Sequence, residues 1–493
     1  MHISSSVSPN PSSTTTAYFN NADIIAPLEI NISSSNQSSL QQQVYDVLQE
    51  IFPSFLAKIP QPHDLKIQPL TGGHSNHLFT VRSQNGCSTN YHQATSTSCR
   101  DDECPAPLPP TILLVRIHDS SDSDNEDPHV NTESGAHKSH YSTVDREYEN
   151  RISAVLSSLK LAPLFYGRFQ NGRLEEFYED VRPLSHTEMG ISYDNDGGTG
   201  NGTGSEYTHT PTYPYTVPIA QQLGKLHRVQ LDESLSKCNG DHCYTWEIYG
   251  RIEDWIQVSN DLHGSSIHSQ ERMILEEIQG EWKWLSREIG PENGGLVGTE
   301  QEGEGNDIDS KEYIQRRAIR YCRDVVFTHM DCQSLNILTP VTPTAVGSTT
   351  SKNDRANKEI RLIDFEYAGM NPRAVDLGNT FAEFCDMNNL KPDYEREYPS
   401  EMCQNVFLLN YICASDDVLA EEIDEMTADG KELFLSIMRD VIGKHSLLSH
   451  LGWACWALIM SKTSTIEFEY VAYAKIRMDG YRFFKSRHWP VYK

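Results

Sequence analysis

The sequence predicts an α+β fold with two lobes, a small β-rich lobe followed by a larger, mainly helical lobe. Runs rich in apolar and β-branched residues at 64–70, 77–81 and 111–118 read as strands, and 144–156 reads as a helix that follows them. Later in the chain, two apolar runs end in polar loops at 325–338 and 360–366. The 493 residues are enough for two lobes with a sizeable core.

Polar stretches interrupt this pattern, and we expect them to be disordered surface segments. They are rich in Gly, Ser, Thr, Asp, Asn or Glu and poor in apolar residues, so they cannot bury enough surface to offset the cost of ordering. They cover 1–38, 84–109, 119–143, 186–216, 292–311 and 341–358. Beyond the N-terminal stretch, we expect the first lobe at 39–180 and the second lobe at 181–493.

The first lobe carries a glycine-containing turn between its first two strands, at residues 71–76. Glycines in such a turn let backbone N–H groups approach a phosphate. The candidate phosphate-binding residues are Gly72, Gly73, Ser75 and Asn76. A Gly-Gly pair is also common in hairpin turns that bind nothing, which remains the alternative.

The strand at 111–118 carries one cation, Arg116, in the place where protein kinases keep a strand lysine that binds phosphates. The helix at 144–156 follows, and its Glu147 is the candidate acid that orients Arg116. The alternative is that both residues are surface charges.

Two motifs in the second lobe predict the chemistry. The loop His329-Met330-Asp331 is followed by Asn336, and the second apolar run ends in Asp364-Phe365-Glu366. Transfer of a phosphoryl group to a hydroxyl needs a carboxylate to accept the proton, and an amide and a further carboxylate to hold magnesium on the nucleotide. Asp331 is the candidate base, Asn336 and Asp364 are the candidate metal ligands, and Glu366 is a further ligand. A single His-x-Asp can be a turn formed by chance, but both motifs in this order favour a kinase-like site.

With these motifs the chain resembles the choline/ethanolamine kinases, which have a protein-kinase-like two-lobed fold. The blocks at 362–369 and 449–459 are the most specific part of the resemblance. The matching segments are 70–81, 113–117, 144–149, 162–167, 171–173, 219–227, 327–338, 362–369, 376–384, 449–459 and 464–470.

The resemblance implies ATP- and Mg²⁺-dependent phosphorylation of an amino alcohol, with Gln333 among the nucleotide-binding residues. For ethanolamine this reaction is the first step of phosphatidylethanolamine synthesis through CDP-ethanolamine. It also implies an ammonium site of aromatic faces and a carboxylate, because ring quadrupoles attract cations. The residues for it are Trp453, Trp456, Phe468 and Tyr473, with Glu383 as the carboxylate. Plain core packing is the alternative for such an aromatic stripe.

The sequence departs from the family pattern at Met330, where Asn is common, and at Thr380, where His is common. It also has Asn388 where choline kinases tend to have a further Tyr. The missing Tyr and the blocks at 367–369 and 464–469 resemble ethanolamine kinases, whereas 331–333 resembles choline kinases. We expect ethanolamine to be preferred, with choline or dual specificity as the alternative. An inactive pseudokinase scaffold is the alternative of a different class, but Asp331, Asn336 and Asp364 are all present.

The formal net charge of −28 makes nucleic acid and anionic membranes unsuitable partners, since both favour basic surfaces. The longest apolar run, 451–460, is too short to span a bilayer. The N-terminus lacks the features of secretory and mitochondrial signals. We therefore expect a cytoplasmic enzyme without integral membrane association, and a homodimer is left open.

Overall fold

The structure is a computed structural model. It describes residues 25–32, 36–70, 76–83, 110–118, 143–190, 192–193, 211–212, 214–231, 235, 246–264, 269–291, 308–341, 359–387 and 389–489. The chain divides into two compact units, 1–126 with 150–178 and 127–149 with 179–493. The sequence analysis placed the boundary after residue 180 and gave 127–149 to the first lobe.

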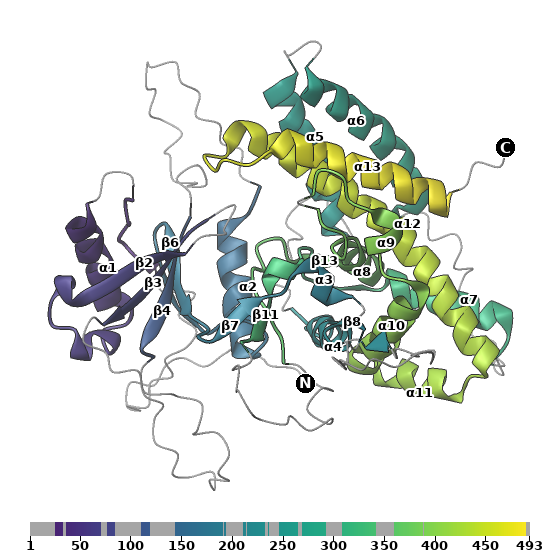
Figure 1. Cartoon of the computed structure of the whole chain (residues 1–493), viewed down its shortest axis with the longest axis horizontal. Helices are drawn as coiled ribbons and strands as arrows, with labels where there is room; N and C mark the ends of the chain where they lie inside the picture. Colours follow the sequence, from purple (N-terminus) through teal and green to yellow (C-terminus); the bar gives the residue numbers. More distant parts are fainter. Residues whose placement is uncertain are drawn as a thin grey trace, which may run out of the picture. The chain divides into compact units, whose positions relative to one another are not determined.

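The first unit is built on a six-stranded sheet with the strand order β1-β5-β6-β4-β3-β2 (Figure 1). Only the β1–β5 pair is parallel among these strands, and the other pairs are antiparallel. The core of the unit includes Leu65, Val81, Leu113 and Leu174, all without solvent exposure. The strands are β1 (Ile25–Ala26), β2 (Leu65–Leu70), β3 (Asn76–Ser83), β4 (Ile112–His118), β5 (Phe165–Phe169) and β6 (Gly172–Glu176), and the helix packed on them is α1 (Gln37–Ile51).

The expected disorder of residues 1–38 is wrong for 25–32 and for 36–38, where Asn36 caps α1 and the next two residues begin it. Ile25 and Ala26 form the edge strand β1, and Ile30 is buried, 1 % exposed. The side chain of Asn171 accepts a hydrogen bond from Ile30 N and donates one to Ile30 O, both at 3.0 Å. The few apolar residues here are enough to extend the sheet, and the polar composition around them concealed this. Residues 1–24 lie outside the described part of the chain.

The expected insert 186–216 is also narrower than predicted. Ser185 and Glu188 form a capping box that begins α3 (His186–Met189), a local signal that composition alone does not reveal. The hydroxyl of the buried Thr216 donates to Met189 O at 2.7 Å, which fixes the start of α4 (Thr216–Leu226). Two short strands, β8 (Ser192–Tyr193) and β9 (Pro211–Thr212), pair between these helices. Most of the other predicted inserts lie outside the described residues.

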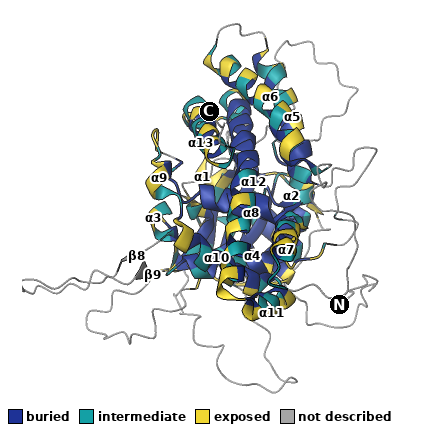
Figure 2. Ribbon diagram, turned by 90° about the vertical axis from the view of Figure 1, so that its right-hand side faces the viewer, coloured by how far each residue is buried: buried dark blue, intermediate teal, exposed yellow. Residues whose placement is uncertain are grey.

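The second unit is organised around one long helix, α12 (Ala428–Thr463), whose residues from 445 to 459 are all buried (Figure 2). Helices α5, α6, α7, α8 and α13 contact it. A Cβ at Gly378 of α8 would lie 2.9 Å from Ile442 O of α12, so glycine permits this close approach. The other helices are α5 (Glu247–His263), α6 (Gln270–Ile289), α7 (Lys311–Arg323), α8 (Arg373–Ala382), α9 (Tyr394–Glu397), α10 (Glu401–Ser415), α11 (Asp417–Glu425) and α13 (Tyr470–His488). Within the described residues, no helix has the length and apolar character needed to cross a bilayer.

Two small antiparallel sheets carry the motif loops of the second unit. In one, β10 (Val325–Thr328) pairs with β13 (Gly369–Pro372). In the other, β11 (Ile337–Pro340) lies between β12 (Arg361–Leu362) and β7 (Val181–Pro183). The His-x-Asp loop therefore runs from β10 to β11, and the Asp-Phe-Glu loop runs from β12 to β13.

We predict that His445 makes the protein less stable as the pH falls. This residue is buried in α12 and donates from Nδ1 to Val441 O at 2.8 Å. Burial lowers its pKa to about 4. The unfolded chain therefore takes up a proton near pH 6.5, where the folded chain does not, and stability falls between about pH 6.5 and 4 by roughly 3 kcal/mol. Urea unfolding at several pH values should show that the free energy of unfolding falls less steeply with decreasing pH for His445→Gln than for the wild type. Equal slopes for the variant and the wild type would contradict this prediction.

Candidate active site

The His-x-Asp loop is hydrogen-bonded to the carboxylate of Asp376, which lies in α8 and is fully buried. Its Oδ2 accepts a hydrogen bond from His329 N and its Oδ1 accepts one from Met330 N, each at 2.8 Å. A single side chain therefore satisfies two successive backbone N–H groups immediately before Asp331. The sequence analysis did not identify Asp376, although a lone acid among the buried residues of α8 was an available signal.

A buried polar network supports Asp376 in turn. His227 Nε2 donates to Asp376 Oδ2 at 2.8 Å, the hydroxyl of Tyr411 contacts His227 Nδ1, and Arg373 donates to the Tyr411 oxygen at 3.1 Å. Burial would raise the pKa of Asp376, but the hydrogen bond from His227 lowers it overall. Burial also lowers the pKa of His227. The pair is thus an ionised carboxylate beside a neutral imidazole that donates to it.

The loop contains backbone that a non-glycine residue rarely adopts. Met330 has φ 66° and Asp364 in the second motif has φ 67°, both in the left-handed region. Such a conformation costs on the order of 1 kcal/mol or more and persists only where neighbours impose it. The hydrogen bond from Met330 N to Asp376 is one such restraint.

The two motif loops lie against one another, linked by His329. Its Nε2 donates to Ile363 O at 3.1 Å, and its ring lies 4.7 Å from that of Phe365. Ile363 N in turn donates to Asn336 O at 3.0 Å. The backbone of Ile363 and the ring of Phe365, on either side of Asp364, are therefore in contact with the loop that carries Asp331 and Asn336.

Asp331 and Asn336 are directly bonded. Asn336 Nδ2 donates to the carboxylate of Asp331 at 2.8 Å and to its carbonyl at 3.0 Å, and Gln333 Nε2 lies 3.4 Å from the same carboxylate. These hydrogen bonds use the amide nitrogen of Asn336 and not its amide oxygen, the atom that would bind the predicted metal ion. Burial, followed by the charges of Glu383 and Asp364, raises the pKa of Asp331.

Asp364 and Glu366 lie together with a third carboxylate that the sequence analysis missed, Glu149 of α2 (Arg146–Ser158). One ligand oxygen from each of the three lies within 4.8 Å of the others. Arg146 Nη1 donates to Glu149 at 2.8 Å and to Glu366 at 2.9 Å. Oxygen donors in such a group fit the needs of Mg²⁺. We call Glu149, Asp364 and Glu366 the carboxylate group.

In the first unit, Arg116 is buried and its Nε donates to Glu175 of β6 at 3.3 Å. Arg173 donates to the other oxygen of Glu175 at 2.6 Å. Glu175 is thus an acid that orients Arg116, and the sequence analysis had not named it. Glu147, which it had named, is exposed and belongs to the other unit, so its pairing with Arg116 stays a prediction.

The predicted phosphate-binding turn falls mostly outside the described residues. This applies to Gly72, Gly73 and Ser75, whereas Asn76 opens β3. Asn76 is buried, and its Oδ1 lies 3.0 Å from His118 Nδ1. The position of Asn76 beside the turn is therefore fixed by a neighbouring strand.

The predicted aromatic residues come together in the second unit, near Asp331. Ring centroids are 5.5 Å apart for Trp453 and Trp456, 6.1 Å for Trp456 and Tyr473, and 5.7 Å for Phe468 and Tyr473. Tyr367, which the sequence analysis did not assign, joins them with its ring 4.9 Å from that of Trp453. We call these five residues the aromatic cluster.

Glu383 lies at this cluster, but it already has a cationic partner. Arg477 Nη2 donates to Glu383 Oε1 at 2.5 Å, and the two side chains are only 2 % and 6 % exposed. The guanidinium of Arg477 also lies 5.0 Å from the ring centroid of Tyr473 and 5.9 Å from that of Trp453. Arg477 was missed, although it lies four residues after Tyr473 and hence on the same helix face.

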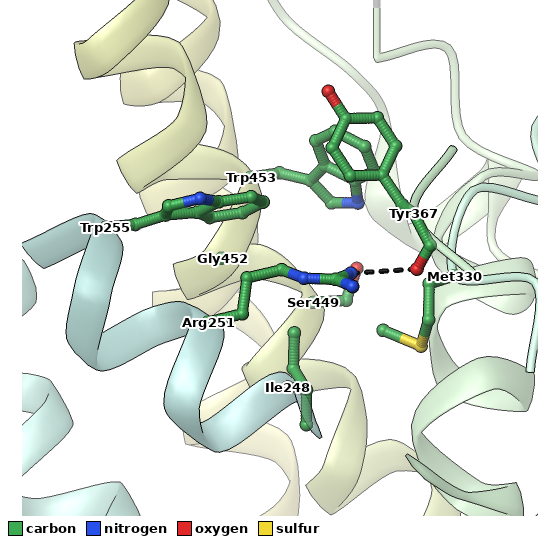
Figure 3. Close-up of a pocket in the computed structure, with 8 residues that line it drawn as sticks. All are labelled: Ile248, Arg251, Trp255, Met330, Tyr367, Ser449, Gly452 and Trp453. Atoms are coloured by element: carbon green, nitrogen blue, oxygen red, sulfur yellow. Dashed lines mark hydrogen bonds between the residues drawn. The ribbon is translucent and has the colours of Figure 1, made fainter. Parts of the chain in front are cut away.

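A second cation borders the cluster on the side of α5. Figure 3 shows Arg251 in a small pocket, with Nη1 donating to Tyr367 O at 2.8 Å. Its guanidinium lies 5.9 Å from the ring centroids of both Trp255 and Tyr367. The pocket, of about 10 Å³, has room for about one water molecule. The pocket is therefore too small for an amino alcohol, the substrate that the resemblance implies.

The arrangement of strands and helices is that of the protein-kinase-like phosphotransferases. Residues 67–192 and 213–482 match the model of the choline/ethanolamine kinase family, and the chain belongs to this family. Its fold is accordingly the protein-kinase-like fold predicted from the sequence.

Individual relatives carry both substrate names. Ethanolamine kinase 2 of Rattus norvegicus is 26% identical over 340 residues, which are 69% of this chain and 65% of that protein, slightly under two thirds of its length. In structure, the chain is similar to choline kinase from Cryptosporidium parvum Iowa II (TM-score 0.57, 18% identity, 90% of this chain and 95% of that one). It is also similar to an ethanolamine kinase from Plasmodium vivax (TM-score 0.56, 18% identity, 93% of each chain). At these identities the two structures show the fold alone.

We predict that Asp376→Asn destabilises the protein by about 2–4 kcal/mol, because an amide in place of the carboxylate removes the charge and leaves one buried N–H without an acceptor. Urea unfolding measures the change. Asp417→Asn is the matched control, since Asp417 is 77% exposed and pairs with Arg228 at the surface. An unfolding free energy of Asp376→Asn within about 0.5 kcal/mol of wild type, the range of ordinary surface substitutions, would refute the proposed anchoring.

Proposed function

We propose that the protein is an amino-alcohol kinase that transfers the γ-phosphoryl group of ATP to the hydroxyl of ethanolamine. The observation that carries the proposal is the position of Asp331. This buried carboxylate lies within the electrostatic influence of Asp364 in the carboxylate group and of Glu383 at the aromatic cluster. A base that adjoins both a metal-binding group and an ammonium site is what this reaction requires.

In this mechanism Asp331 accepts the hydroxyl proton of the substrate. Asn336 orients its carboxylate, and the raised pKa makes it a better proton acceptor than an ordinary aspartate once it is ionised. Asp364, Glu366 and the amide oxygen of Asn336 would hold Mg²⁺, which when bound neutralises charge on the nucleotide phosphates. Arg116, fixed by Glu175, is the proposed phosphate-binding cation of the first unit.

The aromatic cluster and Glu383 form the proposed ammonium site. Because Arg477 binds Oε1 of Glu383, we assign Oε2 to the substrate. A primary ammonium has three N–H donors that can use this oxygen, whereas a trimethylammonium has none and instead gains from aromatic walls. In the sequence, Asn388 occupies a position where choline kinases tend to have a further Tyr, and it lies outside the described residues. These features together favour ethanolamine over choline as the substrate.

The alternatives are choline or dual specificity within the same family, and an inactive scaffold outside it. Asp331, Asn336 and Asp364 are all present and linked through the motif loops, which speaks against a scaffold. Phosphoethanolamine is a precursor of phospholipid, so the proposed reaction would be a step of phospholipid synthesis.

We expect Asp331→Asn to lower kcat by at least about 100-fold, since a positioned base contributes about 10²–10⁴. Nucleotide binding should remain nearly unchanged, because the variant keeps the shape of the side chain. Steady-state kinetics on ethanolamine, with nucleotide affinity measured by calorimetry, separate the two effects. If the variant retains a tenth of the wild-type turnover, Asp331 is not the base.

We expect kcat/KM to be higher for ethanolamine than for choline, and Glu383→Gln to lower the value for ethanolamine more. The variant removes a charged acceptor that only the primary ammonium can use. Kinetics with both substrates measure this ratio, and Glu421→Gln on the exposed surface of α11 is the matched control. A preference of tenfold or more for choline would overturn the substrate assignment and leave the kinase assignment intact.

A further inference from the structure

Arg146 lies in the carboxylate group, which supplies the proposed metal ligands Asp364 and Glu366, and it binds two of the three carboxylates, Glu149 and Glu366. We propose that Arg146 is a built-in counter-ion that keeps the carboxylate group from binding a divalent cation strongly in the absence of nucleotide. The inference rests on the proposed function for the identity of the metal site. It makes Arg146 a positioning residue, which acts through Glu149 and Glu366.

The inference is based on the hydrogen bonds that Arg146 donates to Glu149 and Glu366, which we call the bridge. A single nitrogen, Nη1 of Arg146, donates to Oε2 of Glu149 at 2.8 Å and to Oε2 of Glu366 at 2.9 Å. The three side chains are 11 %, 0 % and 6 % exposed. The guanidinium is therefore held at the carboxylate group with little access to water, unlike an ordinary surface arginine.

Charge explains what the bridge does. Three ionised carboxylates with oxygens within 4.8 Å of one another repel strongly unless a proton or a cation lies among them. Arg146 supplies one positive charge and shares two of the three carboxylates with any incoming ion. A divalent ion on these oxygens would lie a few ångströms from the guanidinium, where repulsion at reduced dielectric weakens binding by more than about tenfold.

The consequence is that the divalent ion binds together with the nucleotide and not before it. Nucleotide phosphates bring additional oxygen ligands and negative charge, which offset the repulsion from Arg146. The ion is then bound well as part of the nucleotide complex and poorly by itself. A purely structural ion pair differs in its effects, because removing it would lower stability and loosen the carboxylates without improving metal binding.

The test is Mn²⁺ binding to the full, nucleotide-free chain, followed by electron paramagnetic resonance of the free ion. Arg146→Gln should bind Mn²⁺ at least about tenfold more tightly than wild type, because it removes the competing charge. Arg146→Lys keeps the charge and should stay within a few-fold of wild type. Adding Asp364→Asn to Arg146→Gln should abolish the gain in Mn²⁺ affinity. This result would show that the additional affinity comes from the carboxylate group. Arg228→Gln, which breaks an exposed ion pair with Asp417, is the matched control.

Unchanged or weaker Mn²⁺ binding by a folded Arg146→Gln overturns the proposal. If this variant does not fold, the wild-type chain provides the second measurement. Its Mn²⁺ affinity should rise at least about tenfold with a non-hydrolysable ATP analogue, after correction for Mn²⁺ bound to free analogue, and equal affinities overturn the proposal. Neither readout uses phosphoryl transfer, so a chain that phosphorylates no amino alcohol would contradict the proposed function and leave this result interpretable.

Discussion

The geometry of the second unit depends on one buried carboxylate, that of Asp376. Two successive N–H groups of the His-x-Asp loop donate to it, and the imidazole of His227 donates from the other side. An ionised group without solvent contact is costly unless such donors surround it. Since every residue of α8 is buried and α8 packs on the long helix α12, the position of Asp331 is set by helices of the core. The candidate base Asp331 is thus positioned by contacts of its loop with the core.

Charge compensation is the second constraint on the site. The chain carries a net charge of −28, and its functional carboxylates are close together, yet fixed guanidinium groups accompany them. Arg146 bridges Glu149 and Glu366, Arg477 binds Glu383, and Arg116 binds Glu175. The Arg477–Glu383 and Arg116–Glu175 pairs are buried, and the Arg146–Glu366 pair is partly buried, so removing one partner leaves the other with little contact with water. The charges that the substrate and the metal ion encounter are therefore smaller than a count of carboxylates suggests.

The sequence was informative where a local pattern carries the chemistry. The apolar runs placed the strands, and the two motifs placed Asp331, Asn336, Asp364 and Glu366 on neighbouring loops. It was uninformative where a partner comes from a distant segment, because Glu149, Glu175, Asp376 and Arg477 are ordinary charged residues until folding buries them. Composition also failed for 25–32, where a few apolar residues add a strand to an existing sheet edge. The distant partners are identified by their burial and their contacts in the folded chain, which the spacing of residues in the sequence does not reveal.

The two departures from the family pattern, Met330 and Thr380, are both accommodated around Asp376. Met330 takes the left-handed conformation without the local hydrogen bonds of an asparagine side chain, but its N–H is held by Asp376 and its side chain packs at the pocket beside Trp453. Thr380 lies one turn after Asp376 and donates to its carbonyl at 2.9 Å, which keeps the hydroxyl within its own helix. Neither change alters an acceptor of the loop N–H groups. The loop N–H groups are therefore held by a residue, Asp376, that both departures leave in place.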